Sequence, residues 1–164
     1  DENIRFFIIK SLNYKNLAVS VKQGKWATHR SHKTSLNAAF HQCSKVIFFF
    51  SVNESKHFQG CALMMSTIDD KANVVEGNVR SWTGQFQVRW LHVCELPFRT
   101  VAHLQNPLNG NMPVIRSRDC QELTRELGVQ MLVLLYRQPK VELQDAAMEG
   151  ELELHTFSSA VGTG

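Results

Sequence analysis

The strongest pattern in the chain is the apolar stretch at residues 45–66, KVIFFFSVNESKHFQGCALMMS. Residues 46–50 form a continuous β-branched and aromatic run, which is typical of a strand that is buried on both faces in the middle of a sheet. Turn residues at 53–56 separate this run from a second apolar run, in which Gly60 indicates a bulge or a close approach of another segment. The pattern predicts a central β-hairpin.

Shorter patterns surround the hairpin on its N-terminal side. Residues 4–10, IRFFIIK, predict a strand, and a helix follows that buries Leu17, Ala18 and Val21 and ends at Gly24, a residue suited to the positive φ of a C-cap. Residues 35–43 have the i, i+3, i+4, i+7 spacing of a second helix. Between the helices, GKWATHRSHKTS is polar and basic, which predicts a loop. Trp26 in this loop either folds back onto the core or is exposed for binding, and its polar surroundings favour exposure.

The C-terminal half is less regular. Residues 67–79 are polar and predict a long loop, whereas the two-residue alternation of residues 81–91 predicts a strand with Trp90 pointing inward and Trp82 at its loop end. Residues 96–114 predict short turns with one brief helix. A third helix precedes Pro139, with an apolar stripe formed by Leu123, Leu127, Met131, Leu134 and Leu135. After residue 141 the chain becomes acidic and then small and polar. Together these elements predict a mixed α/β fold with helices around a sheet.

Composition and charge narrow the class of protein. The 164 residues, 43% hydrophobic and 20% charged, fit one globular domain with a substantial core. The net charge of +3 permits an anionic partner without requiring one. The absence of a signal-peptide pattern and of a run of about 20 apolar residues predicts a soluble chain without membrane contact. Four widely spaced cysteines predict buried free thiols in a reducing compartment rather than disulfides or zinc ligands.

The chain carries few signs of catalysis. It lacks the GxSxG, GxxxxGK and HExxH motifs, and the adjacent Asp69 and Asp70 are typical of solvated loop acids. His29 and His32 have a spacing that could hold a metal, but no cysteine or carboxylate lies near them in sequence. We therefore expect no enzyme activity, no cofactor and no metal. Tryptophans at loop ends together with scattered cations fit single-stranded nucleic acid, because bases stack on rings while cations contact phosphates.

Eight blocks of sequence resemble the YTH domain, a reader of N6-methyladenosine in RNA. In order they are RFFIIKS, GKWAT, LNAAF, FFFSVNESKHFQGCA, FQVRW, ELPF, HLQNPLNGNMPV and SRDCQEL, over residues 4–139. The chain is most similar to the YTH domain attached to the zinc-finger subunit of the cleavage and polyadenylation specificity factor in plants and some protists. The resemblance implies a curved, six-stranded mixed sheet of barrel-like, PUA-like form, covered by helices. It also implies a YTH domain over residues 1–140 and an extension over residues 141–164, partly helical or disordered.

The resemblance also implies a partner and a cellular role. The partner is single-stranded RNA that contains N6-methyladenosine, and the role is mRNA 3′-end processing, in contact with the cleavage and polyadenylation machinery. The implied location is nuclear, with the cytoplasm as the alternative, and the implied state is a monomeric domain. Two other functions stay open: an RNA-binding domain without methyl selectivity, and a protein-docking module with a vestigial pocket.

Particular residues match the family's binding site. Trp26 and Trp82 match walls of the aromatic cage around the methyladenine, and Ala27 matches the residue whose backbone carbonyl accepts the N6 hydrogen. The residues that match positions along the adenine edge are Ser11, Leu12 and Asn16. Those that match RNA phosphate contacts are Lys10 and Arg118.

The chain departs from the family pattern at two of these positions. The tryptophan that the family usually has five to eleven residues before Trp82 is absent, and Leu12 replaces an asparagine or tyrosine. We expect the loop at residues 67–79 to close the remaining side of the cage. From its polar surroundings we also expect that Trp26→Ala leaves the domain folded, whereas Trp90→Ala destabilises it strongly.

Overall fold

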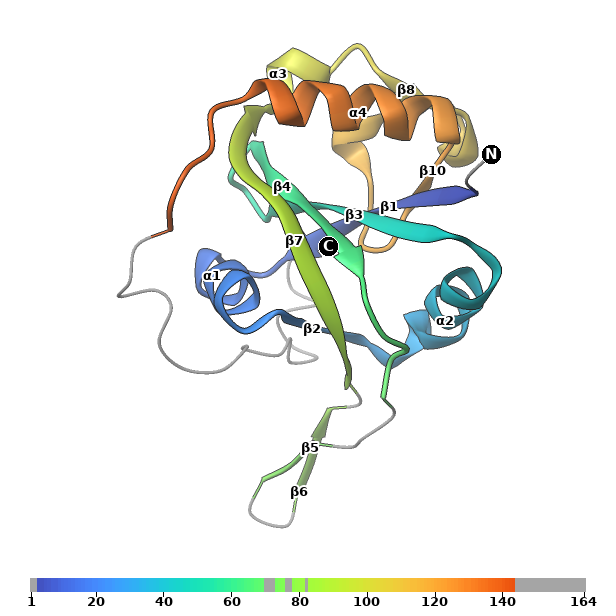
Figure 1. Ribbon diagram of the computed structural model, residues 1–164, viewed down its shortest axis with the longest axis vertical. Helices are drawn as coiled ribbons and strands as arrows, with labels where there is room; N and C mark the ends of the chain where they lie inside the picture. The colour runs from blue at the N-terminus through green and yellow to red at the C-terminus, as the bar shows by residue number, and fades with distance from the viewer. Residues whose placement is uncertain (1–2, 70–72, 76–77, 82, 144–164) are drawn as a thin grey trace.

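The fold is built on one six-stranded sheet. The computed structural model describes residues 3–69, 73–75, 78–81 and 83–143. The strand order is β10-β1-β3-β4-β7-β2, in which β1 and β3 are parallel and the other neighbours antiparallel. The strands are β1 (Ile4–Ser11), β2 (Lys25–His29), β3 (Lys45–Val52), β4 (His57–Met64), β7 (Thr83–Pro97) and β10 (Glu122–Leu123). This confirms the mixed α/β class and the six strands (Figure 1).

The sheet does not close into a barrel, because β2 and β10 remain its two edges. The edges nevertheless approach each other through side chains: Thr28 Oγ1 lies 3.8 Å from Cys120 Sγ. We call this place the seam, with Thr28 and His32 on the β2 side and Asp119 and Cys120 on the β10 side. Backbone pairing cannot close it here, since β10 is two residues long and the chain before it turns at Cys120, whose φ is 64°. The barrel expected from the resemblance is therefore an open sheet.

Strand alternation divides the core into two layers. Phe6 and Ile8 of β1 belong to one hydrophobic cluster, whereas Phe7 and Ile9 belong to the other. Helix α4 (Arg125–Arg137) covers the first face, which we call the α4 face. Helices α1 (Tyr14–Gln23) and α2 (Lys33–Gln42) cover the opposite face, the α1/α2 face (Figure 1).

The central hairpin is confirmed as β3 and β4. The turn between them contains two non-glycine residues of positive φ, Glu54 at 65° and Lys56 at 59°. Gly60 has a φ of 148°, and a Cβ placed on it would lie 2.1 Å from the carbonyl oxygen of His92 on β7. The β4–β7 register shifts between Phe58 and Gly60. The bulge and close approach predicted at Gly60 are therefore both present.

The three predicted helices are all confirmed, as α1, α2 and α4, and side chains cap the starts of α1 and α4. The side chain of Asn13 accepts a hydrogen bond from the amide of Asn16 at the start of α1, and Gly24 ends the helix with a φ of 66°. Thr124 caps α4 in the same way, accepting from the amide of Leu127. Leu123, which belongs to the predicted apolar stripe of the third helix, instead lies in β10.

Between β4 and β7 the structure differs from the predicted loop. Residues 73–75 and 78–81 form a small antiparallel hairpin, β5 (Asn73–Val75) and β6 (Asn78–Ser81). The loop prediction is therefore wrong for those strands, because strands of three and four residues are too short to show a clear alternation. Asp70 and the other predicted loop residues at 71–72 and 76–77 lie outside the described residues. The brief elements elsewhere are η1 (Arg30–His32), α3 (Phe98–Val101), β8 (Gln105–Asn106), η2 (Pro107–Asn109), β9 (Met112–Pro113) and η3 (Val114–Arg116).

All four cysteines are free thiols, as predicted. Cys61 and Cys94 are buried within the α4 face, and burial raises the pKa of Cys61 to about 12 and that of Cys94 to about 11. Cys43 and Cys120 are partly buried. The two buried thiols thus stay protonated at neutral pH and act as small apolar side chains.

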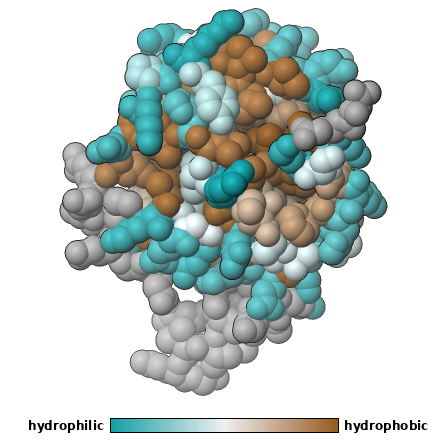
Figure 2. Space-filling view, viewed as in Figure 1, coloured by the Kyte–Doolittle hydropathy of each residue, from teal (hydrophilic) through white to brown (hydrophobic). Residues whose placement is uncertain are grey.

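The surface combines hydrophilic side chains with an apolar area. The outer side of α4 exposes Val129, Val133 and Tyr136, and hydrophobic surface extends over the upper and middle parts of the view in Figure 2. No helix among the described residues has the length and apolar character needed to cross a membrane. Beyond α4, the amide of Val141 donates to the carbonyl of Val93 over 2.9 Å, and Leu143 packs against the α1/α2 cluster.

Candidate nucleic-acid interface

Trp26 lies in strand β2 rather than in a loop. Its side chain is 4% exposed and packs edge-on against Phe50, with ring centroids 5.0 Å apart and planes at 84°. Trp26 and Thr28 point inward, while Lys25 and His29 are more exposed, which gives the strand its two-residue alternation. The predicted exposed loop was wrong, because a five-residue edge strand with basic outward residues resembles a polar loop in sequence. Trp26 therefore belongs to the α1/α2 face of the core.

The backbone of Ala27 points out of the sheet edge. Ala27 lies opposite Gln85, whose carbonyl oxygen accepts a hydrogen bond from the amide of Asp69 on the other side of β7. Residues facing each other in an antiparallel pair either exchange both hydrogen bonds or turn both groups away. Because the Gln85 carbonyl is turned toward Asp69, Ala27 and Gln85 form a pair of the second kind. The carbonyl of Ala27 is therefore directed away from β7, at the edge that borders the seam.

The adjacent register positions support this assignment. The carbonyl of Gln87 accepts from the amide of Met65, and its amide donates to Ser66 Oγ, so both groups of Gln87 also point away from β2. Gln87 faces Lys25, two residues before Ala27. The same pair type at both positions is what the alternation of an antiparallel ladder requires.

The predicted base-edge residues gather where β1 enters α1. Ser11 is fully buried and its hydroxyl donates to the carbonyl of Asn13 over 2.8 Å. Asn13 Oδ1 accepts from the amide of Asn16 over 2.7 Å, and Asn16 is 4% exposed. Leu12 between them is half-buried. The N-terminal turn of α1 thus fixes two buried polar residues, and α1 packs against β2, the strand of Trp26 and Ala27.

The two predicted phosphate-binding cations differ in their surroundings. Arg118 is exposed. Lys10 is half-buried: its Nζ lies 3.3 Å from Ser51 Oγ and 5.6 Å from the centroid of the Phe98 ring. Burial lowers the pKa of Lys10, and the charge of Asp119 partly opposes this shift. Since Phe98 packs on the α4 face, the ammonium of Lys10 lies on the opposite side of the sheet from Trp26.

The second wall and the third side of the predicted cage come from the segment between β4 and β7. Trp82 lies outside the described residues, as do residues 70–72 and 76–77 of the segment expected to close the third side. The beginning of that segment is anchored, because the amide of Ile68 donates to Asn37 Oδ1 over 2.8 Å and that of Asp69 donates to the carbonyl of Gln85 over 2.9 Å. The described start of the predicted loop is therefore tied to α2 and to β7.

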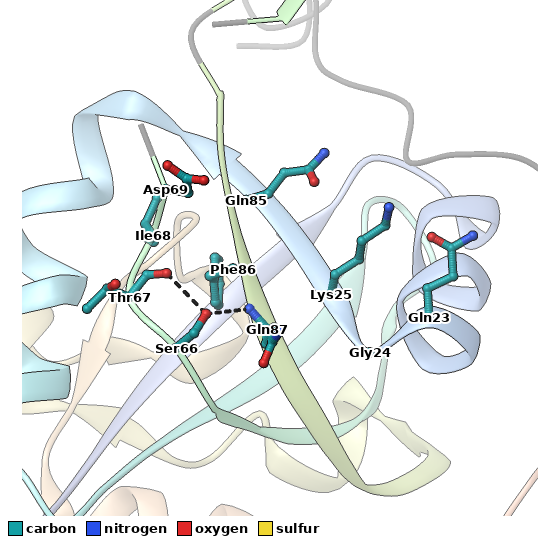
Figure 3. A pocket seen from close by; sticks show the side chains of 10 residues that line it. All are labelled: Gln23, Gly24, Lys25, Ser66, Thr67, Ile68, Asp69, Gln85, Phe86 and Gln87. Carbon is teal, nitrogen blue, oxygen red and sulfur yellow. Dashed lines mark hydrogen bonds between the residues drawn. The ribbon is translucent and has the colours of Figure 1, made fainter. Parts of the chain in front are cut away.

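A polar hollow adjoins the exposed side of β2 and β7 (Figure 3). Its volume is about 650 Å³, and hydrogen bonds from Ser66 to Thr67 and from Gln87 to Ser66 shape one wall. It is lined by Gln23, Gly24, Lys25, Ser66, Thr67, Ile68, Asp69, Gln85, Phe86 and Gln87. Of the described residues predicted for the cage and the base edge, none lines this hollow. It lies beside the candidate site, and the one aromatic residue in its lining, Phe86, is 3% exposed and belongs to the core of the α1/α2 face.

The seam brings together residues that the sequence analysis did not predict to be neighbours. His32 Nε2 lies 3.8 Å from Asp119 Oδ2, and Cys120 follows directly. Burial raises the pKa of the Cys120 thiol above its usual range. The sequence showed no carboxylate or cysteine near His32, because Asp119 and Cys120 are almost 90 residues away along the chain and only the fold brings them close. The available signal was the block SRDCQEL, which is polar yet ends in the short strand β10.

Comparison with known proteins agrees with the fold. The model of the YTH family, described as a YT521-B-like domain, matches residues 4–136. The chain is 47% identical over 145 residues to the zinc finger CCCH domain-containing protein 45 of Oryza sativa subsp. japonica, with 85% of this chain covered. It is 44% identical over 151 residues to the 30-kDa cleavage and polyadenylation specificity factor 30 of Arabidopsis thaliana, with 90% covered. The chain spans only 22% and 24% of the lengths of these relatives.

Solved structures give the same result. The Toxoplasma CPSF4 YTH domain in complex with a 7-mer m6A-modified RNA superposes with a TM-score of 0.79 at 34% identity, covering 87% of this chain and 97% of that one. The Pho92 YTH domain in complex with m6A gives 0.76 at 29% identity, covering 87% and 92%. With a family model over most of its length and relatives well above 30% identity, the chain belongs to the YTH family.

Proposed function

We propose that this chain binds single-stranded RNA and recognises N6-methyladenosine in it. The observation that carries the proposal is the outward direction of the Ala27 carbonyl, next to the buried ring of Trp26 on an edge strand. A carbonyl in that position can accept the one N6 hydrogen that the methylated base retains. Two solved relatives in the family hold m6A or m6A-modified RNA.

The remaining residues take complementary roles in this proposal. Trp26 and Trp82 are walls that stack on the base, while Asn16, Ser11 and Leu12 border its edge. Because Trp26 is 4% exposed, the base reaches the ring only by a local displacement of its neighbours. Stacking contributes about 1–3 kcal/mol per base, but it favours methylated and unmethylated adenine equally.

Discrimination comes from the methyl group and from the donor it replaces. N6-methyladenosine is neutral, so cation–π attraction does not distinguish it. Burial of one methyl group contributes about 0.8 kcal/mol. Unmethylated adenine would instead bring a second N–H against the aromatic ring of the cage, and leaving that donor without a hydrogen bond costs about 1–3 kcal/mol. The larger part of the selectivity is therefore a penalty on the wrong base.

The whole protein has a wider role in this proposal. Similarity to the polyadenylation specificity factor of Arabidopsis thaliana supports a role in mRNA 3′-end processing in the nucleus, in contact with the polyadenylation machinery. The RNA-binding part comprises residues 1–140 and acts as a monomeric, non-catalytic module, and residues 141–164 form an extension. Neither the fold nor the candidate site requires a cofactor for this binding.

Phosphate contacts by Arg118 give the first testable consequence. Replacing Arg118 with alanine is expected to weaken the binding of methylated and unmethylated RNA equally. It should also reduce the slope of log affinity against log salt concentration by about 0.7. The same substitution at Arg137, at the end of α4, is the matched control and should change neither quantity. In this proposal the ammonium of Lys10 leaves Ser51 Oγ and contacts a phosphate when RNA binds, so Lys10→Ala should also lower the slope. An unchanged slope would remove the substituted residue from the interface.

NMR spectroscopy of the three tryptophan indoles tests the location of the site. With signals assigned by single Trp→Phe substitutions, methylated RNA should shift the indole N–H signal of Trp26. Trp90 is an internal reference, because it is partly buried and its Nε1 donates to Ser20 Oγ over 3.0 Å. Equal shifts with unmethylated RNA would support the non-selective RNA-binding domain. No shift of any indole with either RNA would contradict the proposed site and favour a docking module.

A further inference from the structure

Three metal-binding groups meet at the seam. One ligand atom from each of His32, Asp119 and Cys120 lies within 4.8 Å of the other two, and His32 Nε2 is 3.8 Å from Asp119 Oδ2. All three residues are partly exposed, so an ion can enter from solvent. They come from two distant parts of the chain: His32 ends η1 after β2, whereas Asp119 and Cys120 precede β10.

The donor set selects the class of ion. We propose that His32, Asp119 and Cys120 bind a zinc-class divalent transition metal through one imidazole nitrogen, one carboxylate oxygen and one thiolate sulfur. Zinc bonds of about 2.0–2.3 Å in a tetrahedron place neighbouring ligand atoms about 3.3–3.7 Å apart. The observed spacing reaches that range with side-chain shifts of about 1 Å. Thiolate and imidazole are poor ligands for Mg²⁺ and Ca²⁺, which prefer all-oxygen sites.

Contacts outside the three ligands hold two of them in place. Asp119 Oδ1 accepts from the amide of Lys10 over 2.9 Å, which orients the carboxylate with Oδ2 toward His32. The amide of Cys120 donates to the carbonyl of Ile8 over 2.7 Å, and its φ of 64° fixes the side-chain direction. Thr28 Oγ1, 3.8 Å from the sulfur, can donate to a thiolate. Such supporting hydrogen bonds orient metal ligands.

Charge and proton balance are consistent with this ion. On binding, the thiol of Cys120 releases its proton to solvent, and the sulfur bonds to the metal as a thiolate. The thiolate and the Asp119 carboxylate together balance the two positive charges, while His32 binds as a neutral imidazole. Three protein ligands leave a fourth position for water, as in open zinc sites.

The bound ion would close the seam. It would join the β2 edge, which carries Trp26 and Ala27, to the segment that is hydrogen-bonded to the end of β1. An ion that binds the folded chain and not the unfolded one raises the midpoint of thermal unfolding. This inference does not depend on RNA binding, and it assigns to the seam a structural role beside the proposed RNA site.

Titration with Co²⁺, a spectroscopic substitute for Zn²⁺, tests the site directly. The wild-type chain should bind one equivalent with the absorption bands of tetrahedral thiolate coordination, and Zn²⁺ should displace it while Mg²⁺ should not. His32→Ala, Asp119→Asn and Cys120→Ser should each weaken binding by at least about tenfold. Cys120→Ser should also abolish the sulfur-to-metal charge-transfer band.

Matched controls use the same residue types elsewhere. His41→Ala and Cys43→Ser lie outside the cluster and should bind Co²⁺ like the wild type. Thermal unfolding without metal, compared with the wild type, checks that each variant is folded. Zn²⁺ should raise the midpoint of the wild type and of both controls, but not that of Cys120→Ser. Binding that is equally strong in all variants, or absent from the wild type, would overturn the proposal.

Discussion

Replacing Trp26 with alanine is expected to lower the free energy of unfolding by about 3–5 kcal/mol, the usual cost of removing a buried tryptophan. The side chain is 4% exposed and contacts the Phe50 ring within the α1/α2 cluster, so truncation leaves a cavity between β2 and β3. Urea unfolding followed by circular dichroism measures this loss. The result would differ from the expectation drawn from the sequence, in which Trp26 was exposed and its loss harmless to the fold.

A smaller substitution separates the core role of Trp26 from its role in binding. Trp26→Phe keeps most of the packing and should leave the domain folded. It should nevertheless weaken the binding of methylated RNA more than the binding of unmethylated RNA. Trp90→Phe is the matched control, since Trp90 contacts the same Phe50 ring at a centroid distance of 4.4 Å. That variant should keep the wild-type ratio of affinities. Equal changes of the ratio in both variants would mean that Trp26 acts only through packing.

Replacing Gly60 with alanine is expected to destabilise the domain by about 3 kcal/mol or more. The added Cβ would lie 2.1 Å from the carbonyl oxygen of His92, a backbone atom that cannot move without disrupting β7. The φ of 148° adds backbone strain for any residue with a side chain. Chemical denaturation measures the change in midpoint, and a proteolysis assay reports whether the variant folds at all.

Gly110→Ala is the control for backbone strain alone. Gly110 also has a positive φ, 59°, but no atom lies within 4 Å of the Cβ position. Its substitution should cost about 1 kcal/mol, the usual penalty for placing a side chain in the left-handed region. If Gly60→Ala and Gly110→Ala had the same effect, the close approach of β4 and β7 at Gly60 would not contribute to stability.

The fold was largely predictable where local patterns and tertiary packing agree. The apolar run of β3, the turn after it and the C-cap at Gly24 all have local causes, so periodicity and capping rules predicted them. Strand β2 was missed because it is short and lies at the edge of the sheet. Its outward basic residues hide an alternation that only pairing with β7 reveals.

The candidate site was less predictable than the fold. Resemblance to the family singled out Trp26 and Ala27, but no local pattern indicates that the Ala27 carbonyl points out of the sheet. That direction follows from pairing with Gln85, almost 60 residues later. Strand alternation places the ammonium of Lys10 on the α4 face, away from Trp26. The direction of the Ala27 carbonyl therefore depends on the pairing between distant strands, which local sequence patterns do not show.

The most direct test of the central claim is a paired titration of the chain with two single-stranded RNAs that differ only in one N6-methyl group. The methyl transfer and the unsatisfied N–H together amount to about 2–4 kcal/mol, which corresponds to at least about 20-fold in affinity. We therefore expect the methylated RNA to bind at least about 20-fold more tightly. Equal dissociation constants for the two RNAs, or no binding of either, would contradict the claim that this chain reads N6-methyladenosine.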